Sequence, residues 1–170
     1  LMGDKVWNPA MLLLHGDHGL LPSLASTLGV PVRLVYVIRN PFDVVATMVR
    51  RSGASVRDRS DWYLMHCLAA ESLRRRVGAE GFLDLHLEEL IASPQSEIPR
   101  LCRFLELAVP AGYPEACAKT LFSEPKVTRD EVAWTPGEVS GLVSEMKRFR
   151  CLHRYLEEPY PESGTKPGEE

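Results

Sequence analysis

Two residues eight positions apart, Arg39 and Thr47, have side chains that could together bind a phosphate group. Arg39 follows the apolar, β-branched run Val32 to Ile38, whose length and composition are typical of a strand in a parallel sheet. Asn40 and Pro41 then predict the start of a helix, with asparagine as the N-cap and proline at the first helical position. The strand would deliver a guanidinium to the backbone N–H groups of a helix N-terminus, and Thr47 adds a hydroxyl two turns later. These hydrogen-bond donors suit a phosphate.

The same segment resembles the 3′-phosphate-binding element of the sulfotransferases that use 3′-phosphoadenosine 5′-phosphosulfate (PAPS). In that family a strand ends in Arg-[Asn/Asp]-Pro-x-Asp-Val, and a serine or threonine lies eight positions after the arginine. Here the sequence is RNPFDV, from Arg39 to Val44, followed by Thr47. The resemblance implies that Arg39 and Thr47 hold the 3′-phosphate, the alternative being a surface ion-pairing arginine. Asn40 and Asp43 are explained by helix capping and the helix dipole.

Upstream, the resemblance extends to His15. Sulfotransferases place a catalytic histidine just after a short strand. Here the apolar residues Met11 to Leu14 predict such a strand, and His15 follows it, 24 positions before Arg39. The resemblance implies that His15 is the general base that takes a proton from the acceptor, a role that suits a pKa near neutrality. His18 is a rival for this role, and His15, Asp17 and His18 could alternatively ligate a metal ion.

Downstream, the similarity continues to about Leu152. The sequence LEEL, which starts at Leu87, resembles the family's Tyr-Glu-Asp-Leu segment, in which an aromatic residue contacts adenine. A leucine cannot make the same hydrogen bond, so base recognition would differ. Near the C-terminus, Arg129 lies where the family has a basic loop that contacts the nucleotide. The resemblance therefore implies that Arg129 also binds the nucleotide, and a solvated loop arginine is the alternative.

One part of the family's site has no counterpart in this sequence. The 5′-phosphosulfate loop, a Gly-rich turn with a lysine, precedes the catalytic histidine in the family, and residues 1–10 contain nothing like it. Backbone amides and a lysine in that loop would stabilise the charge that develops on the leaving phosphate. We therefore expect an N-terminally truncated member whose first strand is also missing.

Composition sets outer limits on function. The chain has 170 residues, 45% hydrophobic and 25% charged, as is usual for a globular protein, and its net charge of -3 argues against a dedicated nucleic-acid binder. No apolar run approaches the roughly 18 residues of a membrane span, and the first residues lack a signal-peptide pattern. Four widely separated cysteines predict reduced thiols. A cytoplasmic location is expected, with the Golgi lumen as the alternative if an N-terminal anchor has been lost.

The alternation of strands and helices predicts an α/β, parallel-sheet fold with helices on both faces. The resemblance implies that this is a P-loop-like sulfotransferase fold whose sheet is incomplete at the N-terminus. We expect a partial sulfotransferase-like domain over residues 1–156 and a disordered polar tail over 157–170. The predicted strands cover residues 11–14, 32–38 and 82–87. The predicted helices cover residues 20–28, 41–51, 61–77, 94–107, 113–122 and 138–155, with loops at 52–60 and 123–137.

Taken together, the residues and the resemblance predict a sulfotransferase that moves a sulfuryl group from PAPS to a hydroxyl or amine. The acceptor would be a small molecule or a glycan, the product 3′-phosphoadenosine 5′-phosphate (PAP), and no metal would be needed. One alternative is a non-catalytic, truncated domain that binds nucleotide or serves as an interaction module. A nucleotide kinase-like P-loop protein is the other, but the sequence lacks the Gly-x-x-x-x-Gly-Lys-[Ser/Thr] loop.

Overall fold

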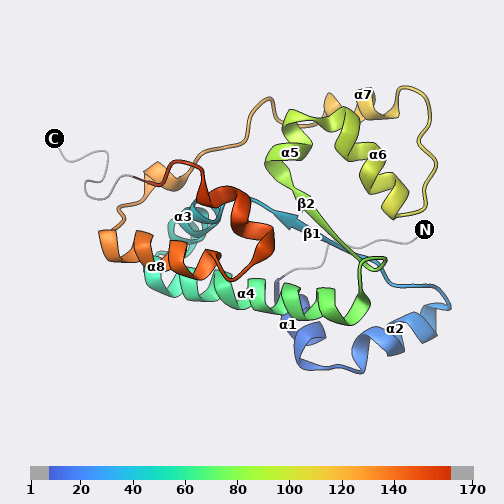
Figure 1. Cartoon of the computed structure of the whole chain (residues 1–170), viewed down its shortest axis with the longest axis horizontal. Coiled ribbons are helices and arrows are strands. Elements are labelled where there is room, and N and C mark those ends of the chain that lie inside the picture. Colours follow the sequence, from blue (N-terminus) through green and yellow to red (C-terminus); the bar gives the residue numbers. More distant parts are fainter. Residues whose placement is uncertain (1–7, 162–170) are drawn as a thin grey trace.

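Two short parallel strands lie in the middle of a largely helical molecule (Figure 1). The computed structural model describes residues 8–161, and all structural statements below concern that range. Strand β1 (Leu34–Ile38) pairs with β2 (Phe82–His86), with Leu34 opposite Phe82 and Ile38 opposite His86. The carboxyl ends of both strands therefore meet at the same edge of the sheet.

Strand β1 continues directly into helix α3 (Pro41–Ser52), as the sequence predicted. The Asn40 side chain caps this helix by accepting a hydrogen bond from the Phe42 amide at 3.0 Å. The helix ends at Gly53, whose φ of 68° lies in the left-handed region that glycine adopts without strain. The chain thus places Arg39 in the short connection between a strand and a well-capped helix.

Helix α4 (Val56–Val77) begins five residues earlier than the sequence predicted. Ser55 caps it by accepting a hydrogen bond from the Asp58 amide at 3.0 Å, and Gly78 follows its last residue. Residues 57–60 are polar, which favoured a loop. Val56 is nevertheless buried in the main core, and this apolar anchor supports the extra turn.

The predicted strand at residues 11–14 is wrong, because this segment is helical. It belongs to helix α1 (Asn8–Gly16), which packs beside α4. Leucine and methionine are good helix formers, and none of the four residues is β-branched. Without a third strand among residues 8–161 to pair with, helix formation satisfies the backbone of this segment locally.

The molecule is a mixed α/β structure, mostly helical, with a sheet of two strands in its described part. Helices α4 and α6 (Pro94–Phe104) both contact β2 and lie on opposite sides of the strands in Figure 1. On one face of β1, Val35 and Val37 are 36% and 55% exposed. The predicted parallel sheet is therefore confirmed in part: two of its three expected strands are present in the described residues, and one face of β1 is partly exposed, although helices were expected on both faces.

The other elements follow the predictions to different degrees. Helix α2 (Leu20–Leu28) has the predicted bounds, whereas α6 and α7 (Tyr113–Ala118) are shorter than expected. A short helix that was not predicted, α5 (Leu87–Ala92), directly follows β2. The single helix expected over 138–155 is two elements, α8 (Pro136–Met146) and the 3-10 helix η2 (Arg150–Leu156).

The main core lies between α3, α4, α8 and η2. It is built around large side chains that are almost fully buried, including Phe42, Trp134, Met146 and Tyr155. The break between α8 and η2 occurs where Phe149, 3% exposed, turns into this core. The four cysteines are free, Cys67 and Cys102 are buried as expected, and burial raises the pKa of Cys67 to about 12.

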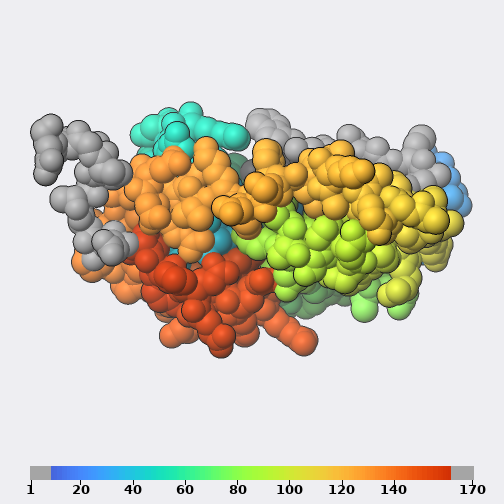
Figure 2. Space-filling view, turned by 90° about the horizontal axis from the view of Figure 1, so that it is seen from above, coloured from blue at the N-terminus to red at the C-terminus, as the bar shows by residue number. Residues whose placement is uncertain are grey.

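The C-terminal segment packs against the loop that precedes α8. Figure 2 shows the segment near residues 125–135 (orange) beside the one near residues 150–160 (red). The Tyr160 ring lies 5.5 Å from the Phe42 ring, and Pro161 is buried. Residues 157–161 are thus part of the packed structure, and the rest of the predicted tail, 162–170, lies outside the described residues.

Candidate functional site

Arg39 lies at the carboxyl end of β1, where the chain turns into α3. Its Nη2 donates hydrogen bonds to the Lys126 carbonyl oxygen and to Thr128 Oγ1, the latter at 3.3 Å. Both partners are neutral, and no carboxylate within residues 8–161 lies within 4.0 Å of the guanidinium. The expected alternative, an ion-pairing arginine, does not hold within the described residues.

Thr47 projects from α3 toward Thr128. The two hydroxyl oxygens are 3.1 Å apart, and each donates to the Asp43 carbonyl oxygen, at 2.7 Å from Thr47 and 2.8 Å from Thr128. Because each hydroxyl has one proton, the two hydroxyls can make at most two of these three hydrogen bonds at a time. The structure brings Arg39 and Thr47 together through Thr128, a residue that the sequence pattern did not single out.

The loop that carries Thr128 is fixed to α3 by Asp43. This buried carboxylate, in a residue that is 3% exposed, accepts the Thr128 amide at 2.7 Å and the Arg129 amide at 2.8 Å. It also accepts the Arg129 guanidinium at 2.9 Å. A buried carboxylate is stable only when such donors compensate it. Asp43 therefore does more than complement the helix dipole, the role inferred from the sequence.

Arg129 is engaged by protein groups on every side. Besides Asp43, its guanidinium lies 3.6 Å from Glu158 and donates to the Pro159 carbonyl oxygen at 3.0 Å. Its side chain is only 13% exposed. Arg129 is thus not the solvated loop arginine offered as one alternative, and its charge is balanced by two carboxylates.

The N-terminus of α3 is also occupied by protein groups. Glu88 Oε1 accepts the Asn40 amide at 2.8 Å, and the Asn40 side chain accepts the Phe42 amide. The Asn40 side-chain nitrogen donates to Glu158 Oε2 at 2.7 Å. The sequence pattern had suggested that these first amides would bind a phosphate. In the structure, both of these amides already have protein acceptors.

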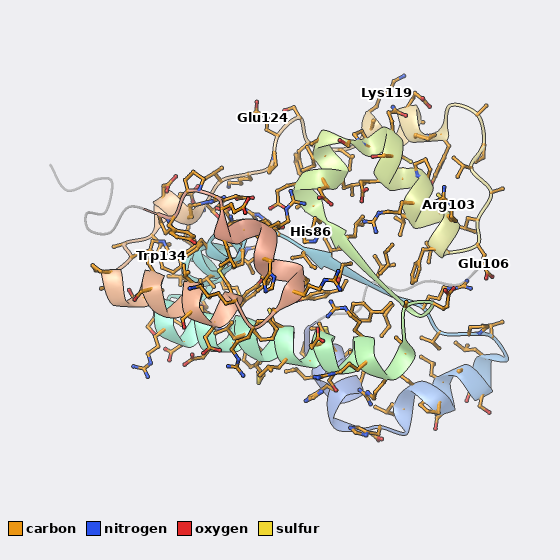
Figure 3. All side chains as sticks on the ribbon, in the orientation of Figure 1. His86, Arg103, Glu106, Lys119, Glu124 and Trp134 are labelled. Atoms are coloured by element: carbon orange, nitrogen blue, oxygen red, sulfur yellow. The ribbon has the colours of Figure 1, made fainter. Side chains whose placement is uncertain are left out.

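A second group of polar side chains meets at the carboxyl end of β2. Glu88 accepts the Tyr155 hydroxyl at 2.7 Å, and the same hydroxyl oxygen lies 3.2 Å from His86 Nδ1. Figure 3 shows His86 between β2 and η2. Burial and the hydrogen bond to Glu88 raise the pKa of Tyr155, whereas burial and the nearby Arg154 lower the pKa of His86.

His15 lies elsewhere, in the last turn of α1. The preceding carbonyl, that of Leu14, accepts a hydrogen bond from Arg76 in the last turn of α4, just before the amino end of β2. His15 Nδ1 is buried without a partner, and His18 is exposed in the turn after α1. No hydrogen bond in residues 8–161 links His15 to Arg39 or Thr47, so its role as general base stays a prediction.

Residues 8–161 show neither a metal site nor a membrane-spanning helix. No group of three or more His, Cys, Asp or Glu side chains there is placed to hold a metal ion, the set around His15 included. None of the described helices is both long enough and apolar enough to cross a membrane.

Parts of the chain are similar to known sulfotransferases. A search of curated proteins finds no match. Among solved structures, the sulfotransferase domain from the curacin biosynthetic pathway is similar at 16% sequence identity and a TM-score of 0.48, covering 89% of this chain and 61% of that one. Residues 32–111 match the model of the sulfotransferase family. The matched range contains both strands, the Arg39 motif and Glu88, so residues 32–111 belong to the sulfotransferase family.

Proposed function

We propose that this protein is a sulfotransferase that binds PAPS through Arg39 and Thr47 and transfers its sulfuryl group to a hydroxyl or amine. The acceptor would belong to a small molecule or a glycan. The observation that carries the proposal is the Arg39 guanidinium, which has only neutral partners and lies beside two hydroxyls at the carboxyl end of a parallel strand. Ligands of parallel sheets bind outside this end of the strands.

The 3′-phosphate is the part of the nucleotide that this cluster suits. A guanidinium forms short, charge-assisted hydrogen bonds with phosphate oxygens, stronger than those it makes to a carbonyl or a hydroxyl. An arriving phosphate would therefore replace the Lys126 carbonyl and Thr128 as partners of Arg39, or add to them. Thr47 and Thr128 could each turn a hydroxyl proton to the same anion. Adenosine 5′-phosphate, which lacks the 3′-phosphate, would lose these contacts.

In this proposal Arg129 acts through Asp43 and does not touch the nucleotide. A direct contact, as the resemblance implies, would require the guanidinium to leave a buried carboxylate, and an uncompensated buried charge is costly. By keeping Asp43 paired, Arg129 holds residues 126–128 against α3 and so keeps Thr128 beside Arg39. We therefore assign Arg129 a positioning role.

In the transfer step, the acceptor atom would attack sulfur as the bond between sulfur and the 5′-phosphate oxygen breaks, releasing PAP. Positioned cations carry the charge that develops on the leaving group, by analogy with phosphoryl transfer, so the proposal requires no metal. The resemblance assigns the base to His15. The chain covers 61% of the length of the similar solved domain. The sulfuryl transfer is therefore proposed for the protein, and it is not carried over from that domain.

A second candidate function is a domain that binds the nucleotide without transferring sulfate, or an interaction module. The observation that favours it is in the sequence, which has no Gly-rich loop with a lysine to stabilise the leaving phosphate. Such a domain would bind PAP but would not turn over PAPS. Both candidates share the Arg39 site, so a binding experiment tests them together.

The experiment that tests the site compares PAP binding by the unmodified chain and by Arg39→Ala. Loss of a charge-assisted contact is expected to cost about 1.5–3 kcal/mol, which corresponds to roughly a 10- to 150-fold rise in Kd. Arg51→Ala is the matched control, because Arg51 is an exposed arginine in the last turn of the same helix. Equal PAP affinities for the two variants would contradict the assignment of Arg39.

A further inference from the structure

Three ionisable side chains form a chain of hydrogen bonds beside the Arg39 site. His86 Nδ1 lies 3.2 Å from the Tyr155 hydroxyl oxygen, which lies 2.7 Å from Glu88. The other Glu88 oxygen accepts the Asn40 amide at 2.8 Å, directly after Arg39. His86 is also the register partner of Ile38, the residue before Arg39. Paired strands are about 4.8 Å apart, so His86 and Arg39 begin from neighbouring points of one sheet edge.

The donor and acceptor capacities of these groups fix the position of the imidazole proton. Tyr155 has a single hydroxyl proton, and it is donated to the Glu88 carboxylate, which can only accept. The Tyr155 oxygen must therefore accept the hydrogen bond from His86, so His86 carries its proton on Nδ1. In the neutral imidazole the lone pair then lies on Nε2, which makes that atom the basic one.

The basic nitrogen of His86 is open to solvent. His86 is only partly buried, and its Nε2 has no hydrogen-bond partner within residues 8–161, yet it is not among the buried polar atoms without a partner. His66 provides a contrast, because its Nδ1 contacts the Trp62 carbonyl at 2.8 Å while its Nε2 is buried and unpartnered. Among the histidines of residues 8–161 with an assigned Nδ1 proton, His86 alone has an Nε2 that is not buried.

We propose that His86 Nε2, in place of His15, takes the proton of the acceptor group at this edge of the sheet, with Tyr155 and Glu88 as positioning residues. The inference rests on the proposed sulfuryl transfer from PAPS. The acceptor oxygen or nitrogen forms the new bond to sulfur, and the sulfur–oxygen bond to the 5′-phosphate breaks. Its electron pair leaves with the phosphate, and the acceptor proton moves to Nε2. The resulting imidazolium keeps its Nδ1–H bond to Tyr155.

The charged groups around His86 are consistent with a neutral base. Burial and Arg154 lower its pKa, while the carboxylates of Glu89, Asp84 and Glu88 oppose this effect. Arg154 is itself paired with Glu89. A histidine with a lowered pKa is unprotonated at neutral pH and can accept a proton.

The first test is the tautomer of His86, measured by ¹⁵N NMR of the whole chain at pH 8. The structure assigns the proton to Nδ1 in His86. His153 is the internal reference, because its Nε2 lies 2.9 Å from the Lys147 carbonyl and must carry the proton there. Tyr155→Phe removes the acceptor and is expected to abolish the Nδ1 preference of His86 without changing His153. A proton on Nε2 of His86 in the unmodified chain would overturn the inference.

The second test is a pH titration of the His86 and His153 resonances with and without saturating PAP. A bound 3′-phosphate near His86 should raise its pKa by about half a unit or more, because nearby negative charge favours the imidazolium. The His153 pKa should not change. If PAP binds and the His86 pKa does not move, the inference fails while the proposed nucleotide site stands. If PAP does not bind, the proposed function fails and the inference fails with it.

Discussion

At the scale of single residues, the charged side chains of the site differ in whether a group of opposite charge lies beside them. Asp43 and Arg129 neutralise each other in a buried pair, whereas Arg39 has only neutral partners within residues 8–161. A protein interior tolerates charge when it is paired, so Asp43 and Arg129 are explained by stability. We propose that the Arg39 guanidinium, which has no carboxylate partner within residues 8–161, binds a ligand. This distinction separates two arginines that the sequence pattern had placed in the same role.

The Asp43–Arg129 pair gives a stability prediction. Asp43→Asn leaves a largely buried guanidinium without its main partner and should lower the free energy of unfolding by about 3 kcal/mol. Urea unfolding measures this value. Glu145→Gln is the control, because it breaks the exposed ion pair between Glu145 and Arg148 and should cost less than about 0.5 kcal/mol. Similar losses in the two variants would show that the Asp43 pair does not hold the loop to α3.

At the scale of elements, the sequence predicted those parts whose signals are local. The Asn40 cap and Pro41 predicted the start of α3, and the bounds predicted for α2 match the structure. The segment at 11–14 was misassigned because an apolar run of four residues does not distinguish a strand from a helix. The start of α4 was missed because most residues of its first turns are polar. In those turns Val56 is the residue that is buried, and its burial is visible only in the structure.

The earlier start of α4 can be tested through its cap. Ser55→Ala removes the hydrogen bond to the Asp58 amide and should destabilise the protein by about 1 kcal/mol in urea unfolding. Ser26→Ala, at an exposed position inside α2, should be neutral or slightly stabilising because alanine favours helix interiors. No loss in Ser55→Ala would indicate that the first turn of α4 contributes nothing to stability.

At the scale of the whole molecule, segments far apart in the chain complete the site. Arg39 and Thr47 were predictable because one short motif contains both. The sequence did not predict the other members of the site, which are Thr128, Tyr155 and Glu158. Each of them contacts Thr47, Glu88 or Asn40 across more than 65 residues of sequence. A single sequence carries no local signal for such pairings. His86 was missed for the same reason, since its role depends on Tyr155.

The pH dependence of folding follows from His86. Its pKa is lowered in the folded protein, so the unfolded chain binds a proton more readily below about pH 6.5. The His86 contribution to stability is therefore fully present above that pH and is lost as the pH falls through the lower folded pKa. Urea unfolding at pH 7.5 and 5.5 should show a smaller loss for His86→Gln than for the unmodified chain. An equal loss would contradict this role of His86.

The most direct test of the account is calorimetric titration of this chain with PAP and, separately, with adenosine 5′-phosphate. The two nucleotides differ by the 3′-phosphate that Arg39 and Thr47 are proposed to hold. We predict that PAP binds at least about tenfold more tightly, since one charge-assisted contact alone is worth that factor. Equal affinities, or no binding of either nucleotide, would contradict the proposal that the Arg39 guanidinium at the end of β1 is part of a nucleotide site.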